Sequence, residues 1–285
     1  MIDLEILQSA QNPTIRRLVS LRNNRRRRAA GVVLVDGARE TLRAIESGMT
    51  MNAFFEPVDL AGDFVSDLDG LADSRQHAIG LGVHRAVSAE LFTKVCYGEA
   101  QQRCVAEFAA PTDRIADLPP PAPGLILVLD RVEKPGNVGA IFRTADAAGV
   151  AAVLLCDCPS DRFNSNAIRG SLGAVFTVPS ASGSQDEIDR YLAWHAEQVF
   201  AMRVEGATSL YTTDLSARSI AVILGSEADG LADRWKEWGE SPERREVIGV
   251  KLPMKGFVDS LNVSVSAAIV AYEANRQRSL ASDAE

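Results

Sequence analysis

The residues best suited to chemistry lie in three short polar segments, each of which follows an apolar run. The segments are GNVGAIFRTADAAG (136–149), ILGSEADGL (223–231) and LPMKGFVDSLNVSVSAA (252–268). They offer amides, an arginine, a carboxylate and hydroxyls, but neither histidine nor cysteine. Hydrolysis by a serine or cysteine nucleophile with a histidine base is therefore not supported. These groups suit a reaction in which a cofactor carries the reactive group, while the protein orients and deprotonates the substrate.

In the first segment, Gly136 and Gly139 flank Asn137, where the chain is expected to leave a strand and begin a helix. The N-terminus of a helix favours anions. Arg143 follows Asn137 by six residues, nearly two turns, so its long side chain can reach back toward the strand end. The alternative is a capping Asn137 and a surface Arg143. A dinucleotide-binding fold is a further alternative, which the absence of Gly-x-Gly-x-x-Gly disfavours.

The other two segments also place small or polar residues directly after a strand. Gly225 allows close approach by a flat ligand, and Glu227 brings a carboxylate to the rim of the sheet or stabilises a helix N-terminus. Ser260, Asn262 and Ser264 precede or begin the C-terminal helix. They can cap that helix or present amides and hydroxyls to a ligand. Capping accounts for Ser260 but leaves the other two unexplained.

Apolar runs in the second half predict the elements that position these segments. Strands are expected at 125–129, 151–155, 174–178, 199–202, 220–224 and 247–252, and helices at 138–148, 166–172, 186–196 and 261–278. Continuous apolar strands between helices imply an α/β fold with a parallel sheet covered on both faces. Ligands of such sheets bind at the carboxyl ends of the strands, where all three segments fall.

The first half of the chain predicts a smaller α/β domain over residues 1–110. Strands and helices alternate there, and a proline-rich linker follows at 111–123, before the second domain at 124–285. Residues 1–30 contain seven arginines and two acidic residues, a local charge of +5. Guanidinium groups bind phosphates in bidentate fashion, so this stretch is either a nucleic-acid contact or a solvated basic end.

The composition is that of an ordinary globular protein, with 46% hydrophobic and 24% charged residues. The net charge of −8 alone argues against binding of nucleic acid, although the basic start argues for it. No apolar stretch is long enough for a membrane span, and no secretory signal is visible. The four cysteines form no zinc-binding pattern. We therefore expect a reduced, cytoplasmic protein without a metal.

In this order and spacing, the three segments resemble the motifs of the SpoU/TrmH family of SPOUT RNA methyltransferases over residues 124–280. VLVDGARE (33–40) and the basic start resemble the N-terminal substrate-binding domain of the members that act on ribosomal RNA. The resemblance implies transfer of a methyl group from S-adenosylmethionine to a ribose 2′-hydroxyl in RNA. It also implies a deep C-terminal trefoil knot and a homodimer with the active site near its interface.

The resemblance also assigns roles to individual residues. The expected catalytic residues are Asn137, Arg143, Glu227, Ser260 and Asn262. Cofactor contacts, largely through backbone groups, are expected at Gly225, Leu252 and Leu261, with Leu224, Met202 and Met254 beside them. RNA contacts are expected at Arg16, Arg17, Arg25, Arg26, Arg27, Arg39 and Arg169. One departure is the stretch 234–245, which is longer than the family pattern leads us to expect.

Three other functions remain open at this point. The substrate could be transfer RNA instead of ribosomal RNA, or the chain could be a catalytically inactive SPOUT protein that binds RNA. The intact Asn137, Arg143, Glu227 and Asn262 disfavour the inactive form. A nicotinamide-linked oxidoreductase on a doubly wound sheet is the third possibility, and the missing glycine fingerprint disfavours it.

Overall fold

The chain divides into two units, each with its own sheet. Unit 1 is Met1–Pro111 with Phe163–Thr177, and unit 2 is Thr112–Arg162 with Val178–Glu285. The computed structural model describes residues 6–58, 70–98, 103–203, 207–226, 230–239 and 245–282. Within these ranges, no helix has the length and apolar character that a membrane span requires.

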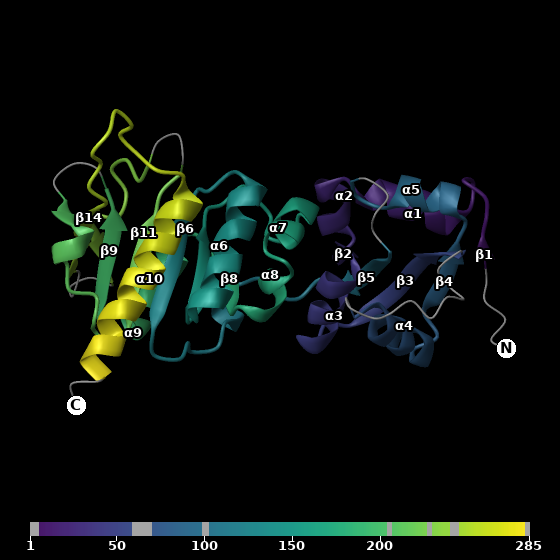
Figure 1. Ribbon diagram of the computed structural model, residues 1–285, viewed down its shortest axis with the longest axis horizontal. Coiled ribbons are helices and arrows are strands. Elements are labelled where there is room, and N and C mark those ends of the chain that lie inside the picture. Colours follow the sequence, from purple (N-terminus) through teal and green to yellow (C-terminus); the bar gives the residue numbers. More distant parts are fainter. Residues whose placement is uncertain are drawn as a thin grey trace. The chain divides into compact units, whose positions relative to one another are not determined.

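Unit 1 is built on a five-stranded mixed sheet in the order β1-β4-β3-β5-β2. Its strands are β1 (Ile6–Leu7), β2 (Val32–Asp36), β3 (Met51–Pro57), β4 (His84–Val87) and β5 (Val105–Ala109). Its helices are α1 (Pro13–Leu21), α2 (Asn24–Ala29), α3 (Ala38–Glu46), α4 (Leu71–Gly80), α5 (Ala89–Val95), α7 (Ser165–Gly170) and α8 (Ala174–Thr177). Helices α1 and α5 lie on one face of the sheet, and α3 and α4 on the other (Figure 1). The apolar side chains of α1 and α5 close the core over the first face.

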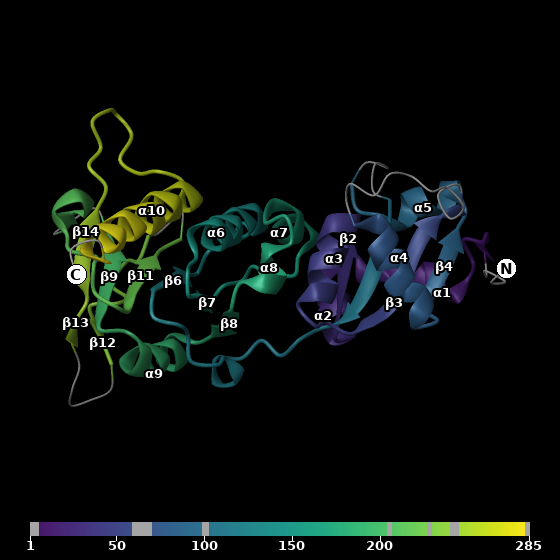
Figure 2. The same cartoon turned by 60° about the horizontal axis from the view of Figure 1, so that its bottom comes forward.

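Unit 2 is built on a seven-stranded sheet in the order β10-β14-β9-β11-β6-β7-β8, in which all neighbouring strands are parallel. Its strands are β6 (Leu125–Asp130), β7 (Ala152–Cys156), β8 (Ser180–Gly183), β9 (Gln198–Met202), β10 (Thr208–Ser209), β11 (Ile220–Leu224) and β14 (Ile248–Lys251). Helices α6 (Pro135–Ala148) and α10 (Val263–Ser282) cover one face, and α9 (Gln185–His195) covers the other (Figure 2). A two-stranded antiparallel pair, β12 (Glu237–Trp238) and β13 (Arg245–Glu246), completes the unit.

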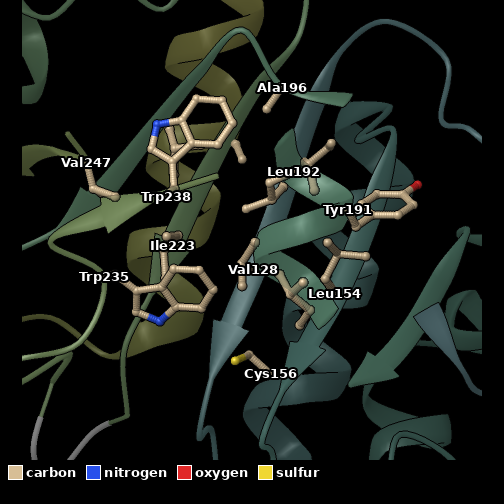
Figure 3. Close-up of a cluster of buried hydrophobic side chains, with 14 of the residues drawn as sticks. Val128, Leu154, Cys156, Tyr191, Leu192, Ala196, Ile223, Trp235, Trp238 and Val247 are labelled. Atoms are coloured by element: carbon tan, nitrogen blue, oxygen red, sulfur yellow. The ribbon is translucent and has the colours of Figure 1, made fainter. Parts of the chain in front are cut away.

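One core cluster of unit 2 lies between this sheet and the elements on its α9 side. Trp235 and Trp238, each about 1% exposed, lie near Ile223 in a cluster that includes Val128 and Leu154 (Figure 3). Every residue of β6, β7 and β11 is buried, as expected for strands covered on both faces. The predicted α/β fold with a covered parallel sheet is therefore confirmed.

One element predicted within the second domain, residues 124–285, is wrong. Residues 174–178 were expected to form a strand because Val175, Phe176 and Val178 favour extended structure. Residues 174–177 instead form the short helix α8, and the neighbouring strand β8 uses the small residues at 180–183. The Ser171 hydroxyl accepts hydrogen bonds from the backbone of Gly173 at 3.2 Å and Val175 at 3.5 Å. These hydrogen bonds stabilise a helical turn at 174–177 and outweigh the preference of the valines for extended structure.

Candidate active site

Two asparagines from distant parts of the sequence meet beside the parallel sheet of unit 2. Asn137 lies in the first turn of α6, and Asn262 directly precedes α10. The Asn262 Nδ2 group donates to Asn137 Oδ1 at 3.2 Å. Asn262 Oδ1 also accepts from the Ser264 amide at 2.9 Å and from its hydroxyl at 2.7 Å. Asn262 therefore caps α10 and, through its other polar atom, joins the first polar segment to the third.

The second polar segment brings Ser226 and Gly230 side by side after β11. The Ser226 amide donates to the Gly230 carbonyl at 3.2 Å, and the Gly230 amide donates to the Ser226 carbonyl at 3.1 Å. A Cβ atom placed on Gly225 would lie 2.3 Å from the carbonyl carbon of Gly230. Only glycine fits at position 225, because this backbone cannot yield as a flexible side chain would. Glu227 lies within 227–229, outside the described residues.

The other two expected catalytic residues are exposed. Arg143 lies on α6, about 9 Å along the helix axis from Asn137 at 1.5 Å per residue. Ser260 precedes α10, and its hydroxyl donates to the Asp259 carboxylate at 3.3 Å. The structure thus brings Asn137 and Asn262 together and leaves Arg143 and Ser260 open to a bound molecule.

The residues expected to contact a cofactor follow three adjacent strands, β14, β9 and β11. Since these strands are parallel, their carboxyl ends meet at one edge of the sheet. Met202 ends β9, Leu224 ends β11, and Leu252, Met254 and Leu261 lie between β14 and α10. Leu224 and Leu252 are buried, Met202 and Met254 are half-buried, and Leu261 is 38% exposed. Their neutral backbone groups and apolar side chains fit a flat, partly apolar nucleoside ligand.

A buried charge cluster lies beside these segments, and the sequence reasoning missed it. Asp130, fully buried at the end of β6, is 3.1 Å from Arg234 Nη2, and the same nitrogen is 2.6 Å from Asp157. Burial raises the pKa of the Asp130 carboxyl, while Arg234 and Arg131 act to lower it. Cys156 and the two aspartates offer ligand atoms within 4.8 Å of one another. Because the Arg234 guanidinium contacts all three, it supplies positive charge to the cluster. Asp130 at the end of an apolar strand was the sequence signal that could have indicated this buried charge.

The basic start of the chain forms two helices, α1 and α2, and not all of its arginines are free to reach RNA. The Arg17 guanidinium pairs with Glu107 on β5, and Arg22 donates to both carboxylate oxygens of Asp36, each at 2.7 Å. Arg27 is only 4% exposed. The ion pairs with β5 and β2 give Arg17 and Arg22 structural roles, and burial gives Arg27 one, that the charge run did not reveal.

The remaining arginines expected to contact RNA are exposed in unit 1. Arg16 lies on α1, and Arg25 and Arg26 lie on α2. Arg39 pairs with the neighbouring Glu40 at 2.6 Å. Arg169 on α7 approaches Gly98 so closely that a Cβ atom there would lie 2.7 Å from Arg169 Nη1.

The parallel sheet and the clustered segments at one edge define a SPOUT-type methyltransferase domain. Residues 124–272 match the SpoU rRNA Methylase family, and residues 12–106 match the MRM3-like substrate binding domain. The chain belongs to the SpoU rRNA methylase family.

Named relatives and solved structures agree with this membership. The chain is 35% identical over 222 residues to the 23S rRNA (guanosine-2′-O-)-methyltransferase RlmB of Xylella fastidiosa strain 9a5c, covering 74% of this chain and 84% of that protein. It is 29% identical over 186 residues to the 23S rRNA (guanosine(2553)-2′-O)-methyltransferase RlmP of Bacillus subtilis strain 168, covering 65% of this chain and 70% of that protein.

Two solved structures resemble the whole chain. An RNA 2′-O ribose methyltransferase superposes with a TM-score of 0.76 at 29% identity, covering 96% of this chain and 99% of that chain. An AdoMet-bound rRNA methyltransferase from Sinorhizobium meliloti superposes with a TM-score of 0.81, covering 96% and 98%. Its identity is 23%, so this second likeness supports the fold alone.

Proposed function

We propose that this protein transfers a methyl group from S-adenosylmethionine to a ribose 2′-hydroxyl of ribosomal RNA. Family membership supports the reaction class. The observation that carries the assignment of the site is the hydrogen bond from Asn262 to Asn137, which joins the first and third polar segments beside the sheet. The names of the RlmB and RlmP relatives make a guanosine of 23S rRNA the first candidate target.

The chemistry requires a weak nucleophile to become reactive. A 2′-hydroxyl attacks poorly until its proton passes to solvent water, and the oxygen then carries negative charge. When bound, S-adenosylmethionine supplies an electrophilic methyl group on a positive sulfonium. Arg143 stabilises the charge that develops on the ribose oxygen and holds the adjacent phosphate, because an arginine remains protonated and binds oxyanions strongly. Charge is neutralised along this path, so a water-poor pocket favours it.

Each of the other expected residues has a proposed role beside Arg143. Asn137 and Asn262 hold the first and third segments in register through their mutual bond. Ser260 and Glu227 offer a hydroxyl and a carboxylate to the RNA or the cofactor. Backbone groups of Gly225, Leu252 and Leu261, with Leu224, Met202 and Met254 beside them, bind the cofactor.

Ribosomal and transfer RNA can be separated directly. We expect labelled methyl groups from S-adenosylmethionine to appear in the large-subunit RNA when the protein is given size-fractionated RNA from cells that lack its gene. Label confined to the transfer RNA fraction would make the chain a transfer RNA enzyme instead. Since the proposed substrate is ribosomal RNA, we place the protein's action in the cytoplasm.

We propose that the exposed arginines of α1 and α2 bind RNA phosphates. Changing Arg25 and Arg26 together to glutamine is expected to weaken RNA binding and to reduce the slope of log affinity against log salt by about 1.5. Both side chains are exposed, so the thermal midpoint should stay unchanged. The matched control is Lys236→Gln, another exposed cation, in unit 2. An unchanged salt slope in the double variant would show that these arginines face only solvent.

We further propose that unit 2 forms a homodimer through an exposed apolar face of α10, and that its C-terminal segments form the trefoil knot that the resemblance implies. Ala267, Val270 and Ala274 are buried, whereas Val265 and Tyr272, which are 46% and 55% exposed, lie seven residues apart on another side of the helix. Phe257, Val258 and Leu261 add exposed apolar surface just before α10. A second copy of this chain would bury such a surface.

The dimer can be tested by sedimentation velocity. Changing Val265 and Tyr272 to glutamate is expected to give monomers, because two buried carboxylates would face each other across the interface. Trp194→Glu is the matched control, since Trp194 is 82% exposed on α9. A monomeric wild-type protein, or a double variant that remains dimeric, would contradict the proposed interface.

A further inference from the structure

We propose that Arg203 and Arg234 are positioning residues that together hold Gly230 against Gly225 and Ser226 in the arrangement that binds the cofactor. The proposal rests on the methyltransferase function above. It concerns the segment 231–235, which directly follows Gly230 and which we call the anchor segment. Neither arginine belongs to the three polar segments of the sequence analysis.

Arg203 binds the backbone of the anchor segment. It directly follows β9, and its guanidinium donates to the carbonyl oxygens of Ala232 at 3.2 Å, Arg234 at 2.5 Å and Trp235 at 2.8 Å. Three carbonyls on one planar cation make a specific contact, because a guanidinium offers its donors in a fixed geometry. The end of β9 therefore determines the path of the chain just after Gly230.

Arg234 binds the same segment to two further strands through its side chain. Its Nη2 atom lies 2.6 Å from Asp157, which follows β7, and 3.1 Å from Asp130, which ends β6. The Asp130 side chain has no exposed surface, so its negative charge is stable there only with a cation beside it. Arg234 thus links the anchor segment to the strand that leads into the Asn137 segment.

The backbone of the anchor segment has a conformation that must be held by its surroundings. Ala232 has φ 46° and Trp235 has φ 59°, both in the left-handed region that residues other than glycine rarely adopt. Trp235 is 1% exposed and packs near Ile223 in the core (Figure 3). The two arginines and this buried indole together fix the segment.

The backbone at Gly230 and Leu231 lies so close to Gly225 that it cannot move without changing the space beside Gly225. A Cβ on Gly225 would already lie 2.6 Å from the Leu231 amide nitrogen, the first atom of the anchor segment. A displaced anchor segment would therefore change the space beside Gly225, one of the proposed cofactor contacts. We expect loss of Arg203 to weaken cofactor binding while leaving the chemical step, which depends on Arg143, largely intact.

The test measures S-adenosylmethionine binding and turnover in the full chain. Arg203→Ala is expected to raise both the Kd and the KM for S-adenosylmethionine at least about tenfold, because several charge-assisted bonds are lost. The kcat at saturating cofactor should change by less than about threefold. Arg203→Lys should recover part of the affinity, since an ammonium keeps the charge but not the forked geometry.

Two further variants keep the test decisive. Arg190→Ala removes an exposed cation on α9, outside the anchor segment, and should leave the KM unchanged. Should Arg203→Ala fail to fold, Asp157→Asn removes only one of the two carboxylates on Arg234 and should raise the KM in the same direction. An Arg203→Ala or Asp157→Asn variant that keeps the wild-type KM, or that loses kcat with an unchanged KM, would overturn the proposal. A wild-type protein that binds S-adenosylmethionine but methylates no RNA would contradict the proposed function and leave the binding measurements to decide this proposal.

Discussion

Arg143→Ala is expected to lower the kcat of methyl transfer by at least about 100-fold, while the Kd for S-adenosylmethionine stays within about twofold. Removal of one group that stabilises an oxyanion typically costs that much in rate. Arg143 is exposed on α6, and the proposed cofactor contacts lie at the ends of β9, β11 and β14, so cofactor binding should not need it. Single-turnover kinetics and calorimetry measure the two quantities separately.

The matched control is Arg190→Ala, which removes an exposed arginine from α9, on the opposite face of the sheet from α6. It should leave both quantities unchanged. Near wild-type turnover in Arg143→Ala would assign activation of the 2′-hydroxyl to another group. Loss of cofactor binding would place Arg143 in the cofactor pocket.

Gly225→Ala is expected to abolish detectable binding of S-adenosylmethionine. The new methyl group would lie 2.3 Å from the Gly230 carbonyl carbon and 2.5 Å from its oxygen. The backbone must then shift, and this would disrupt the two hydrogen bonds that Ser226 and Gly230 exchange. We expect a lower thermal midpoint as well, because over-packed sites typically lose about 1–3 kcal/mol of stability.

Gly256→Ala provides the control for this substitution. A Cβ atom at Gly256 meets nothing within 4 Å, so this variant should bind cofactor normally. If Gly225→Ala bound the cofactor with wild-type affinity, Gly225 would have to lie outside the binding site. Calorimetry with the two variants side by side distinguishes these outcomes.

The parts of the fold that were predictable are those in which one local signal dominates. The strands β6 and β11 are uninterrupted apolar runs, and all their residues are buried. The helix α6 begins at Pro135 and not at Val138 as expected, because proline fits the first turn of a helix and was not used as a start signal. In α8, backbone hydrogen bonds to the Ser171 hydroxyl outweigh the preference of β-branched residues for a strand.

The sequence predicted which segments form the site, but not the contacts between residues that lie far apart in the chain. Asn137 and Asn262 were expected to work together, and the structure joins them across 125 positions. The pairing of Arg234 with Asp130 could not be predicted, because an aspartate at the end of an apolar strand does not indicate which cation will lie beside it, and only the fold brings the two residues together. The sequence likewise shows Arg17 only as part of a basic run, whereas in the structure it pairs with Glu107 on β5.

The most direct test of the proposed activity is the chemical nature of the methylated product. Ribosomal RNA from cells that lack the gene would be incubated with the protein and labelled S-adenosylmethionine, digested to nucleosides and separated by mass spectrometry. We predict a single ribose-methylated nucleoside, with the label on the 2′-oxygen, that is absent when Arg143→Ala replaces the wild type. Label on a nucleobase, or no label in RNA despite bound cofactor, would contradict the proposed activity.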